Sequence, residues 1–426
     1  MSKKVVIFTG LVSVDTNLVG TAVIYKKIAD IFIKEGFQVT MALPQETDLK
    51  DNFINFKVYN EKNNKKIIDS AEVVIFGAYP PTDPLLYSYK KNKIIVTYLW
   101  SIAPVGSLEF KDFKSKKEQI KLHRFINSSY NLSLLLSDKI FCRDEGAKKL
   151  VLGSLISLGR LNLENYTEKR NFNNLLEVAP FGVDESVNRK NKKHFYRGVL
   201  DNVGKDDFLL IWNGGVWNWN DGATLIRAMK KIKNKKVKLI FQGFKHPDKN
   251  KGISFEAKKC FKLAQNLGLK DKNVFFNDTW IPYQDRINFL AESDAGVVCS
   301  PDIPEANLFL KTRIYDYFWA DLPIILNECE AFASLIKEKE LGFVCRTGDY
   351  NDWAKKIDIL SQDGKILKKM KANIRKYKKE ISWQKTLQPL KSFAKRPTKT
   401  RDNNDKLNDL VLSNISLNKS VVEKSK

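Results

Sequence analysis

Residues 301–327 read PDIPEANLFLKTRIYDYFWADLPIILN, and this stretch decides the fold class. Just before it, the apolar run Ala295–Cys299 predicts a buried parallel strand, which a Ser-Pro pair ends. Within the stretch, the pattern predicts a polar loop, a helix from about Leu310 to Trp319 and, after Pro323, a second buried strand over Ile324–Leu326. A strand, a helix and a further strand in this order are typical of an open parallel α/β sheet.

Four charged side chains of this stretch are candidates for ligand binding: Glu305, Lys311, Arg313 and Asp316. Ligands of open α/β sheets bind outside the carboxyl ends of the strands, which is where the Glu305 loop and the start of the helix fall. A helix N-terminus with Lys and Arg nearby suits a phosphate or diphosphate, and ionised carboxylates accept hydrogen bonds from sugar hydroxyls. The alternative is an amphipathic helix with solvated charges, and spacing alone does not decide between them.

The stretch resembles the donor-site motif of a branch of retaining glycosyltransferase family 4, whose members have the GT-B fold. The Thr-Arg-x-x-Asp-Tyr-x-Trp-Ala-Gly-Leu-Pro run of that branch stands here at 312–323, with Asp321 in place of the usual Gly. The resemblance implies a catalytic role for Glu305, which orients sugar hydroxyls. The family holds the diphosphate with an Arg and a Lys in an earlier glycine loop, which this chain lacks, so we expect Lys311 and Arg313 to supply that charge. The resemblance also implies that Asp316 binds the donor ribose or a neighbouring basic side chain.

Three loops between residues 207 and 290 also resemble this branch, and each follows a predicted strand. The first contains Gly214-Gly215, whose backbone amides could approach an anion, and leads to tryptophans at 217 and 219 that either line a cleft or pack. The second contains Lys245-His246, which either contact phosphate or are structural. The third contains Ile281, in the loop whose backbone contacts the base in GT-B enzymes. The resemblance implies that these five residues bind the donor.

The N-terminal half begins with a βαβ unit. A strand over Lys4–Thr9 leads through a loop to a helix over Thr21–Lys34, with Gly20 at the junction. The unit lacks GxGxxG, so a dinucleotide fingerprint is not supported. Gly20 resembles the glycine that opens the corresponding helix of the family near the donor phosphate, and its alternative role is a plain tight turn. His123 is a further candidate, for which a solvated helix position is the alternative.

We therefore expect an α/β chain with the GT-B fold, in which two doubly wound Rossmann-like domains face a cleft. The expected parts are an N-terminal acceptor-side domain (1–184), a linker (185–205), a nucleotide-sugar-binding domain (206–380), a helix crossing back to the N-terminal domain (381–394) and a basic, mobile tail (395–426).

Composition narrows the class of protein and its partners. The chain has 426 residues, 43% of them hydrophobic, and a net charge of +24, which predicts attraction to nucleic acid, an anionic membrane or phosphorylated substrates unless the Lys-rich composition reflects genomic bias. No nucleic-acid motif, membrane-spanning run or signal peptide is apparent, and we expect a cytoplasmic protein, peripheral at the inner face of the membrane. Five scattered cysteines are typical of reduced core residues.

The function that we expect is transfer of a hexose-type sugar, with retention, from a nucleoside-diphosphate sugar to a glycan or lipid-linked acceptor in cell-surface polysaccharide biosynthesis. No Asp-x-Asp occurs, and we expect neither a metal nor a cofactor besides the donor substrate. One alternative is a non-catalytic, basic protein that binds nucleic acid or glycan on a GT-B scaffold. Another is a sugar-nucleotide epimerase of similar fold, which the strand-end motifs favour less.

Overall fold

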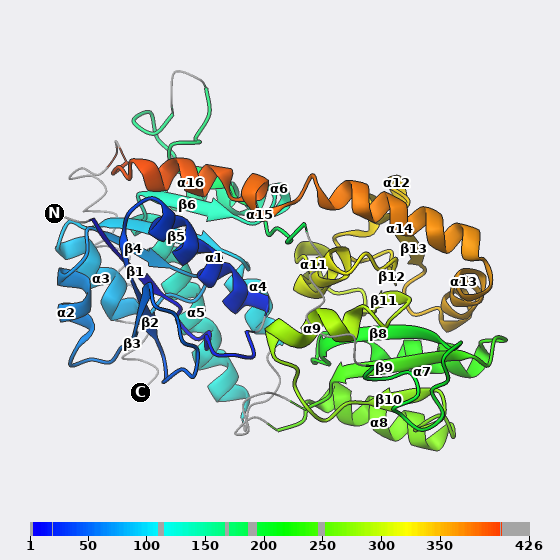
Figure 1. Ribbon diagram of the computed structural model, residues 1–426. Coiled ribbons are helices and arrows are strands. Elements are labelled where there is room, and N and C mark those ends of the chain that lie inside the picture. Colours follow the sequence, from blue (N-terminus) through cyan, green and yellow to red (C-terminus); the bar gives the residue numbers. More distant parts are fainter. Residues whose placement is uncertain are drawn as a thin grey trace. The chain divides into compact units, whose positions relative to one another are not determined.

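The computed structural model describes residues 3–18, 20–109, 115–166, 170–185, 194–245, 252–400 and 402. The chain divides into two compact units: unit 1 comprises residues 1–181 and 384–426, and unit 2 comprises residues 182–383. In the described residues each unit is built on one sheet with helices on both of its faces (Figure 1). The two doubly wound domains expected from the sequence are confirmed.

Unit 1 contains a parallel sheet of seven strands in the order β3-β2-β1-β4-β5-β6-β7. Its central strands are mostly apolar and buried because helices cover both faces, as is usual in parallel sheets. The strands are β1 (Lys4–Phe8), β2 (Gln38–Leu43), β3 (Ile54–Val58), β4 (Val73–Phe76), β5 (Ile94–Leu99), β6 (Lys139–Cys142) and β7 (Leu176–Val178).

The helices of unit 1 include one that comes from the far end of the chain. Helix α16 (Gln388–Lys395) contacts α1 (Gly20–Lys34), and its Phe393 ring meets Phe141 of β6 edge-on at 6.0 Å (Figure 1). The late helix predicted to return to the N-terminal domain therefore does so. The other helices are α2 (Asn64–Asp69), α3 (Thr82–Lys90), α4 (Ala103–Gly106), the 3-10 turn η1 (Ser107–Glu109), α5 (Lys116–Leu136) and α6 (Glu145–Ser157), and α15 (Trp383–Thr386) spans the unit boundary.

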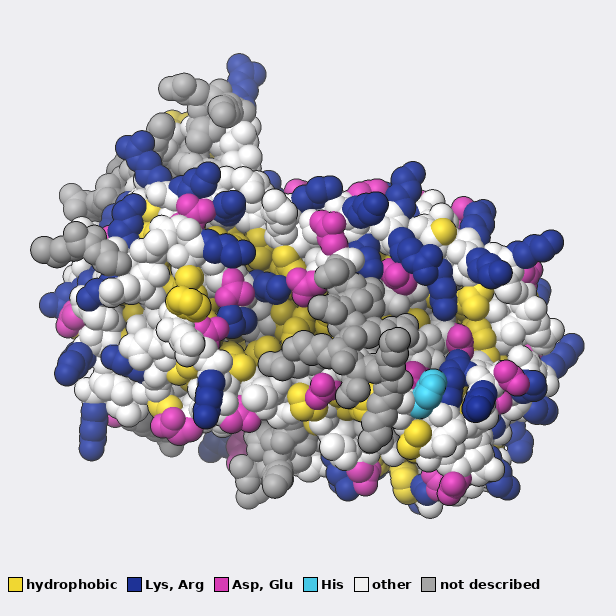
Figure 2. All heavy atoms as spheres, viewed as in Figure 1, with side chains coloured by type: hydrophobic (Ala, Val, Ile, Leu, Met, Phe, Trp, Pro, Cys, Tyr) yellow, Lys and Arg dark blue, Asp and Glu magenta, His cyan; other side chains and the backbone are white. Residues whose placement is uncertain are grey.

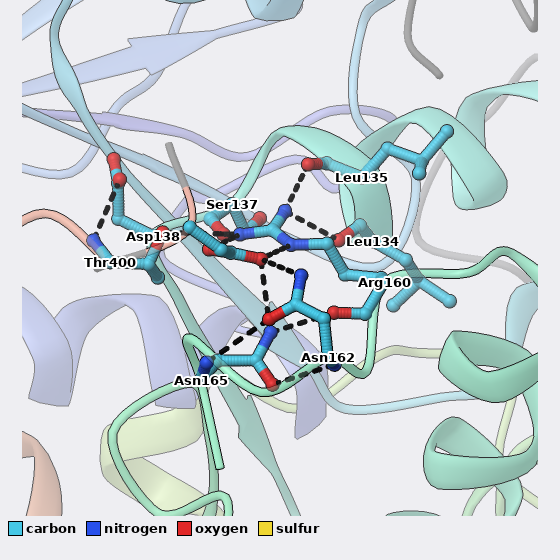
Figure 3. Close-up of polar contacts among 9 residues, drawn as sticks. Leu134, Leu135, Ser137, Asp138, Arg160, Asn162, Asn165 and Thr400 are labelled. Carbon is cyan, nitrogen blue, oxygen red and sulfur yellow. Dashed lines mark hydrogen bonds and ion pairs between the residues drawn. The ribbon is translucent and has the colours of Figure 1, made fainter. Parts of the chain in front are cut away.

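A buried ion pair holds the segment after α16 against unit 1. The guanidinium of Arg160 donates from Nε and Nη2 to the two oxygens of Asp402, at 2.7 and 3.0 Å, and both side chains are 1% exposed. Asn165 Nδ2 donates to the same carboxylate at 2.9 Å, and Asn162 Nδ2 at 3.3 Å (Figure 3). The remaining donors of Arg160 reach the carbonyls of 134, 135 and 137 and the hydroxyl of Thr400.

A second buried carboxylate ties the same segment to the sheet. Asp138 accepts hydrogen bonds from the backbone N–H of Thr400 at 3.1 Å and from that of Ile95 in β5 at 2.9 Å. Burial raises the pKa of Asp138, which Lys399 opposes. We expected a mobile tail from residue 395 onward, and the structure corrects this prediction for Thr400 and Asp402, because their polar groups are paired inside unit 1. Residues 401 and 403–426 lie outside the described residues.

Unit 2 contains a six-stranded parallel sheet in the order β10-β9-β8-β11-β12-β13, which is the doubly wound arrangement of nucleotide-binding folds. Its strands are β8 (Phe208–Gly215), β9 (Val237–Gly243), β10 (Val274–Phe276), β11 (Ala295–Val298), β12 (Ile324–Asn327) and β13 (Gly342–Cys345). Its helices are α7 (Gly222–Lys231), α8 (Phe255–Asn266), α9 (Tyr283–Leu290), α10 (Pro304–Leu308), α11 (Thr312–Trp319), α12 (Ala333–Glu338), α13 (Tyr350–Gln362) and α14 (Gly364–Lys378).

Tyr317 fixes helix α11 to the middle of this sheet. Its buried hydroxyl accepts from the N–H of Asn213 at 3.0 Å and lies 2.9 and 3.0 Å from the carbonyl oxygens of Ile211 and Val297, to which it donates. Burial raises the pKa of Tyr317 to about 12, so the hydroxyl keeps its proton. The ring occupies the space over Gly296, where any Cβ would overlap it. The charged face of α11 is thereby held at the carboxyl ends of β8 and β11.

The expected linker at 185–205 is shorter in the structure. Residues from Phe195 to Arg197 donate their backbone N–H groups to the carboxylate of Glu292, and the Phe195 ring stacks on Phe289 of α9 with the ring centroids 4.0 Å apart. Residues 194–205 therefore pack on unit 2, because burying two aromatic rings outweighs the polar character of the segment. Residues 186–193 lie outside the described residues.

Candidate functional site

The candidate site lies at the point where the strand order of unit 2 reverses. The chain leaves β8 toward β9 on one side and returns through β11 on the other, and such switch points are where doubly wound sheets bind ligands. Charged residues 305, 311, 313 and 316 follow β11 directly, on α10, on α11 and between them. The glycines at 214 and 215 end β8. The structure thus brings the predicted residues of both segments to one edge of one sheet.

Glu305 and Lys311 form a buried ion pair across the turn between α10 and α11. We expected Glu305 in a loop, but it lies in the short helix α10, which Pro304 begins. Lys311 is the residue before α11, and its Nζ donates to Oε2 of Glu305. Both side chains are buried. Each therefore neutralises the other, and Lys311 holds the carboxylate of Glu305 in one orientation.

Arg313 is also buried in part, and among the described residues one of its nitrogen atoms has no partner. Its guanidinium lies over the ring of Trp212 at 4.7 Å, and Nη2 donates to the carbonyl oxygen of Gly215 at 2.7 Å. Within the described part of the chain, the buried Nη1 has no hydrogen-bond partner. An unpaired guanidinium nitrogen at the carboxyl edge of a parallel sheet is a donor suited to an anionic ligand.

Asp316 is fixed by two partners from neighbouring elements. Its Oδ2 accepts from Asn213 Nδ2 at 2.6 Å and from Arg286 Nη1 of α9 at 3.1 Å. Burial raises the pKa of Asp316, against the charge of Arg286 and these hydrogen bonds. The sequence indicated a basic neighbour for Asp316 without identifying it, and the structure identifies Arg286.

The two glycines belong to β8 itself and not to a loop after it. Gly214 has a φ of +82°, a left-handed conformation that favours glycine, at a bulge in the pairing of β8 with β9. Gly215 lies flat against the ring of Trp217, which a Cβ would overlap, and its carbonyl oxygen also accepts from Trp212 Nε1 at 3.2 Å. Trp217 and Trp219 lie with their ring centroids 6.1 Å apart. The ring of Trp217 therefore packs against Gly215, whose carbonyl oxygen positions Arg313.

The remaining predicted donor-binding residues of unit 2 follow β9 and β10. Lys245 is half exposed and forms an ion pair with Asp278 at 2.7 Å, across the ends of these strands. Ile281 is buried immediately before α9. His246 lies outside the described residues. Lys245 and Ile281 follow neighbouring strands on the same sheet edge as the charged cluster.

Two candidates lie in unit 1. Gly20 is the first residue of α1, after β1, as expected. His123 of α5 is partly buried, with Nδ1 2.7 Å from the hydroxyl of Ser107 and Nε2 2.9 Å from Asn127 Nδ2. Both ring nitrogens are therefore engaged, and the solvated position considered for His123 is wrong.

The sequence did not predict one charged residue of the site, Glu330. Glu330, in the loop after β12, is 4% exposed, and the charges of Lys311, Glu305 and Arg313 act on its carboxylate. Burial raises the pKa of Glu330, which Lys311 opposes. No motif points to this residue, and its only signal in the sequence is its position directly after a buried parallel strand.

Comparison with known proteins agrees with this architecture. Residues 218–377 match the model of the family described as glycosyl transferases group 1. No curated protein matches the chain significantly. The solved structure of sucrose-phosphate synthase from Thermosynechococcus elongatus has a TM-score of 0.62 and 12% identity, covering 99% of this chain and 100% of that one.

Two further solved structures are similar over most of their length. The Anabaena protein HepE in complex with UDP and glucose has a TM-score of 0.62 and 11% identity, covering 91% of this chain and 97% of that one. A glycosyltransferase from Rickettsia africae has a TM-score of 0.57 and 16% identity, with 99% of each chain covered. At these identities the likeness establishes the fold. The chain therefore has the GT-B fold, and its residues 218–377 match the model of the glycosyl transferases group 1 family.

Proposed function

We propose that the protein is a retaining glycosyltransferase that moves a hexose-type sugar from a nucleoside-diphosphate sugar to a glycan or lipid-linked acceptor. The observation that carries the proposal is the charged cluster at the switch point of the group 1 domain. There a paired carboxylate, a guanidinium with one nitrogen unpartnered by any described residue, and a second carboxylate follow one strand. These groups match the sugar, the diphosphate and the ribose of a sugar nucleotide.

The role that we propose for each side chain follows from its hydrogen-bonding atoms and their partners. Arg313 offers Nη1 to the diphosphate, and its position over Trp212 keeps it there. Asp316 accepts from a ribose hydroxyl while Arg286 holds its other oxygen. Glu305, oriented by Lys311, accepts from a hydroxyl of the sugar. Because Lys311 is already neutralised by Glu305, Arg313 carries most of the positive charge that we assign to the diphosphate.

Similar structures support the donor class. The Anabaena protein HepE was solved with UDP-glucose, and an Escherichia coli protein of the same fold with UDP-2-fluoro glucose. In a retaining reaction the leaving phosphate accepts the proton of the acceptor on the face that it leaves. The charge of Arg313 then stabilises the phosphate as the glycosidic bond breaks.

We further propose a cytoplasmic location at an anionic membrane surface and a role in cell-surface polysaccharide synthesis. The net charge of +24 supports the first part. Figure 2 shows Lys and Arg side chains spread over the visible face with Asp and Glu between them. The attraction to an anionic membrane that we propose therefore comes from the net charge of the protein and not from one basic patch on this face. In the described chain, no helix is both long and apolar enough to cross a bilayer. A similar structure is WaaG, a glycosyltransferase involved in lipopolysaccharide biosynthesis.

The test is release of nucleoside diphosphate from UDP-glucose, UDP-galactose and GDP-mannose, with candidate acceptors, by the wild type and two variants. Glu305→Gln should lower turnover at least about a hundredfold. Asp302→Asn, which changes an exposed acid beside the same helix, should leave it unchanged. Full activity of Glu305→Gln would contradict the site. Binding of nucleic acid with a steep salt dependence, without binding of any sugar nucleotide, would support the non-catalytic alternative.

A further inference from the structure

The loop after β12 is built into the candidate site from two sides. The N–H of Ala331 donates to the carbonyl oxygen of Ala306 in α10 at 3.1 Å, directly beside Glu305. The ring of Phe332 meets those of Tyr315 and Phe318 of α11 edge-on, at 5.6 and 6.0 Å. Backbone and aromatic contacts therefore fix Glu330, the residue between these anchors and β12, relative to both helices of the site.

The carboxylate of Glu330 is buried, and the Ser300 hydroxyl acts on it to lower its pKa, but within the described chain one of its oxygens lacks a hydrogen-bond partner. Among the described residues, none donates a hydrogen bond to its Oε1. Buried polar atoms that lack a partner are rare in folded proteins, and an isolated buried carboxylate oxygen is costly because it has lost its water. Such an oxygen is suited to a hydrogen-bond donor that a ligand brings.

Arg313, the guanidinium of the site, interacts electrostatically with Glu330. The charge of Glu330 acts on Arg313, and that of Arg313 on Glu330, yet no ion pair joins them within the described residues. Arg313 Nη1 and Glu330 Oε1 are both buried, and neither has a hydrogen-bond partner in the part of the chain that the structure describes. A ligand that bridges them needs an anionic acceptor for the guanidinium and a hydroxyl donor for the carboxylate. A glycosyl phosphate has both groups on adjacent atoms.

We propose that Glu330 recognises the glycosyl unit of the donor by accepting a hydrogen bond from one of its hydroxyl groups, while Arg313 Nη1 binds the adjoining phosphate. This inference rests on the proposed function and deepens it. Glu305 and Glu330 then accept from different hydroxyls of one sugar, while Lys311 pairs with Glu305 and its charge also acts on Glu330. Glu330 thus determines which sugar the enzyme selects, whereas the nucleotide is bound by other residues.

The experiment compares the binding of matched ligands that differ only by the sugar. Isothermal titration is performed with UDP and UDP-glucose and with GDP and GDP-mannose, on the wild type, Glu330→Gln, Glu330→Ala and Glu328→Gln. Glu328 is a matched control because it is an exposed carboxylate in the same loop, where it accepts from the N–H of Thr347 at 3.2 Å. The Gln variant keeps the shape of the side chain and carries the test if the Ala variant does not fold.

We expect the nucleoside diphosphate to bind Glu330→Gln within about twofold of its wild-type Kd. The Kd of the sugar nucleotide should rise about tenfold in the Gln variant and about a hundredfold in the Ala variant, or about 1.4 and 2.8 kcal/mol. Glu328→Gln should bind both ligands normally.

Four results would overturn the inference. Equal weakening of both ligands by Glu330→Gln would assign Glu330 to the diphosphate or to the fold. Unchanged binding of the sugar nucleotide, or the same loss in Glu328→Gln, would remove its role. Failure of the wild type to bind either pair would overturn the proposed function itself, and with it this inference.

Discussion

Replacing Asp402 by Ala leaves the Arg160 guanidinium buried without its counter-ion. Both side chains are 1% exposed, so water cannot take the place of the lost carboxylate. Removing one partner of a buried ion pair costs about 3–5 kcal/mol. An independent count agrees, because two charge-assisted hydrogen bonds from Arg160 are lost at about 1.5–3 kcal/mol each. We therefore expect unit 1 to lose about 3–5 kcal/mol of stability.

Thermal unfolding and hydrogen exchange measure this loss. For a unit of this size, 1 kcal/mol corresponds to about 2–4 °C, so the midpoint for unit 1 should fall by about 6–20 °C. Hydrogen exchange followed by mass spectrometry locates the change, since peptides from β5 and β6 should lose protection and those from β8 and β9 should not. Asp30→Ala is the control, because it breaks the more exposed ion pair of Lys26 in the same unit and should cost less than about 1 kcal/mol.

A loss for Asp402→Ala as small as that for Asp30→Ala would refute this reasoning. It would mean that the carbonyl oxygens around Arg160 satisfy the guanidinium by themselves. The double variant Arg160→Met with Asp402→Ala separates the two explanations. A buried pair replaced on both sides by apolar groups is often tolerated, so the double variant should be more stable than Asp402→Ala alone.

Three further predictions concern single groups. Tyr317→Phe should destabilise unit 2 by about 1–3 kcal/mol in urea unfolding, since the lost hydroxyl forms hydrogen bonds with three backbone groups. A change below about 0.5 kcal/mol would show that the hydroxyl is dispensable. Burial alone would raise the pKa of Asp402, but its hydrogen bonds and ion pair with Arg160 outweigh burial and lower it. Its ionised form therefore contributes stability above its unfolded pKa of about 3.9. The difference in stability between the wild type and Asp402→Asn should be constant from about pH 5 to 7 and shrink as the pH falls below about 4. A difference that grows with acid would contradict this sign. Burial raises the pKa of the thiols of Cys142, Cys260, Cys299, Cys329 and Cys345. All five should therefore react with an aromatic disulfide reagent far more slowly in the native than in the unfolded chain. One rapidly reacting thiol in the native protein would contradict their burial.

The sequence predicted the positions of helices and strands better than the contacts between side chains. Buried strands such as Ala295–Cys299 were readable because parallel strands covered on both faces are continuous apolar runs, and the observed β11 covers most of that run. The helix predicted from about Leu310 begins at Thr312, with Lys311 before it. The strand after Pro323 was likewise found. These features depend on local patterns, so one sequence is enough to place them.

Side-chain pairing could not be predicted in the same way. Nothing in the spacing of Glu305 and Lys311 states that they neutralise each other, since a short helix and a turn bring them together. The partnership of Arg160 with Asp402 joins residues far apart in the chain and places part of the expected tail inside unit 1. Glu330 was missed for the same reason, because its burial depends on helices α10 and α11 and not on its neighbours in the sequence.

The contact between Gly296 and Tyr317 has a consequence for how this protein can vary. A side chain at 296 cannot coexist with the tyrosine ring, and loss of the ring leaves a void beneath α11 together with unpaired backbone groups on two strands. Substitutions at either position are therefore deleterious alone and acceptable only in combination. Among related chains the two positions should change together, and those that have lost Tyr317 should carry a larger residue at 296.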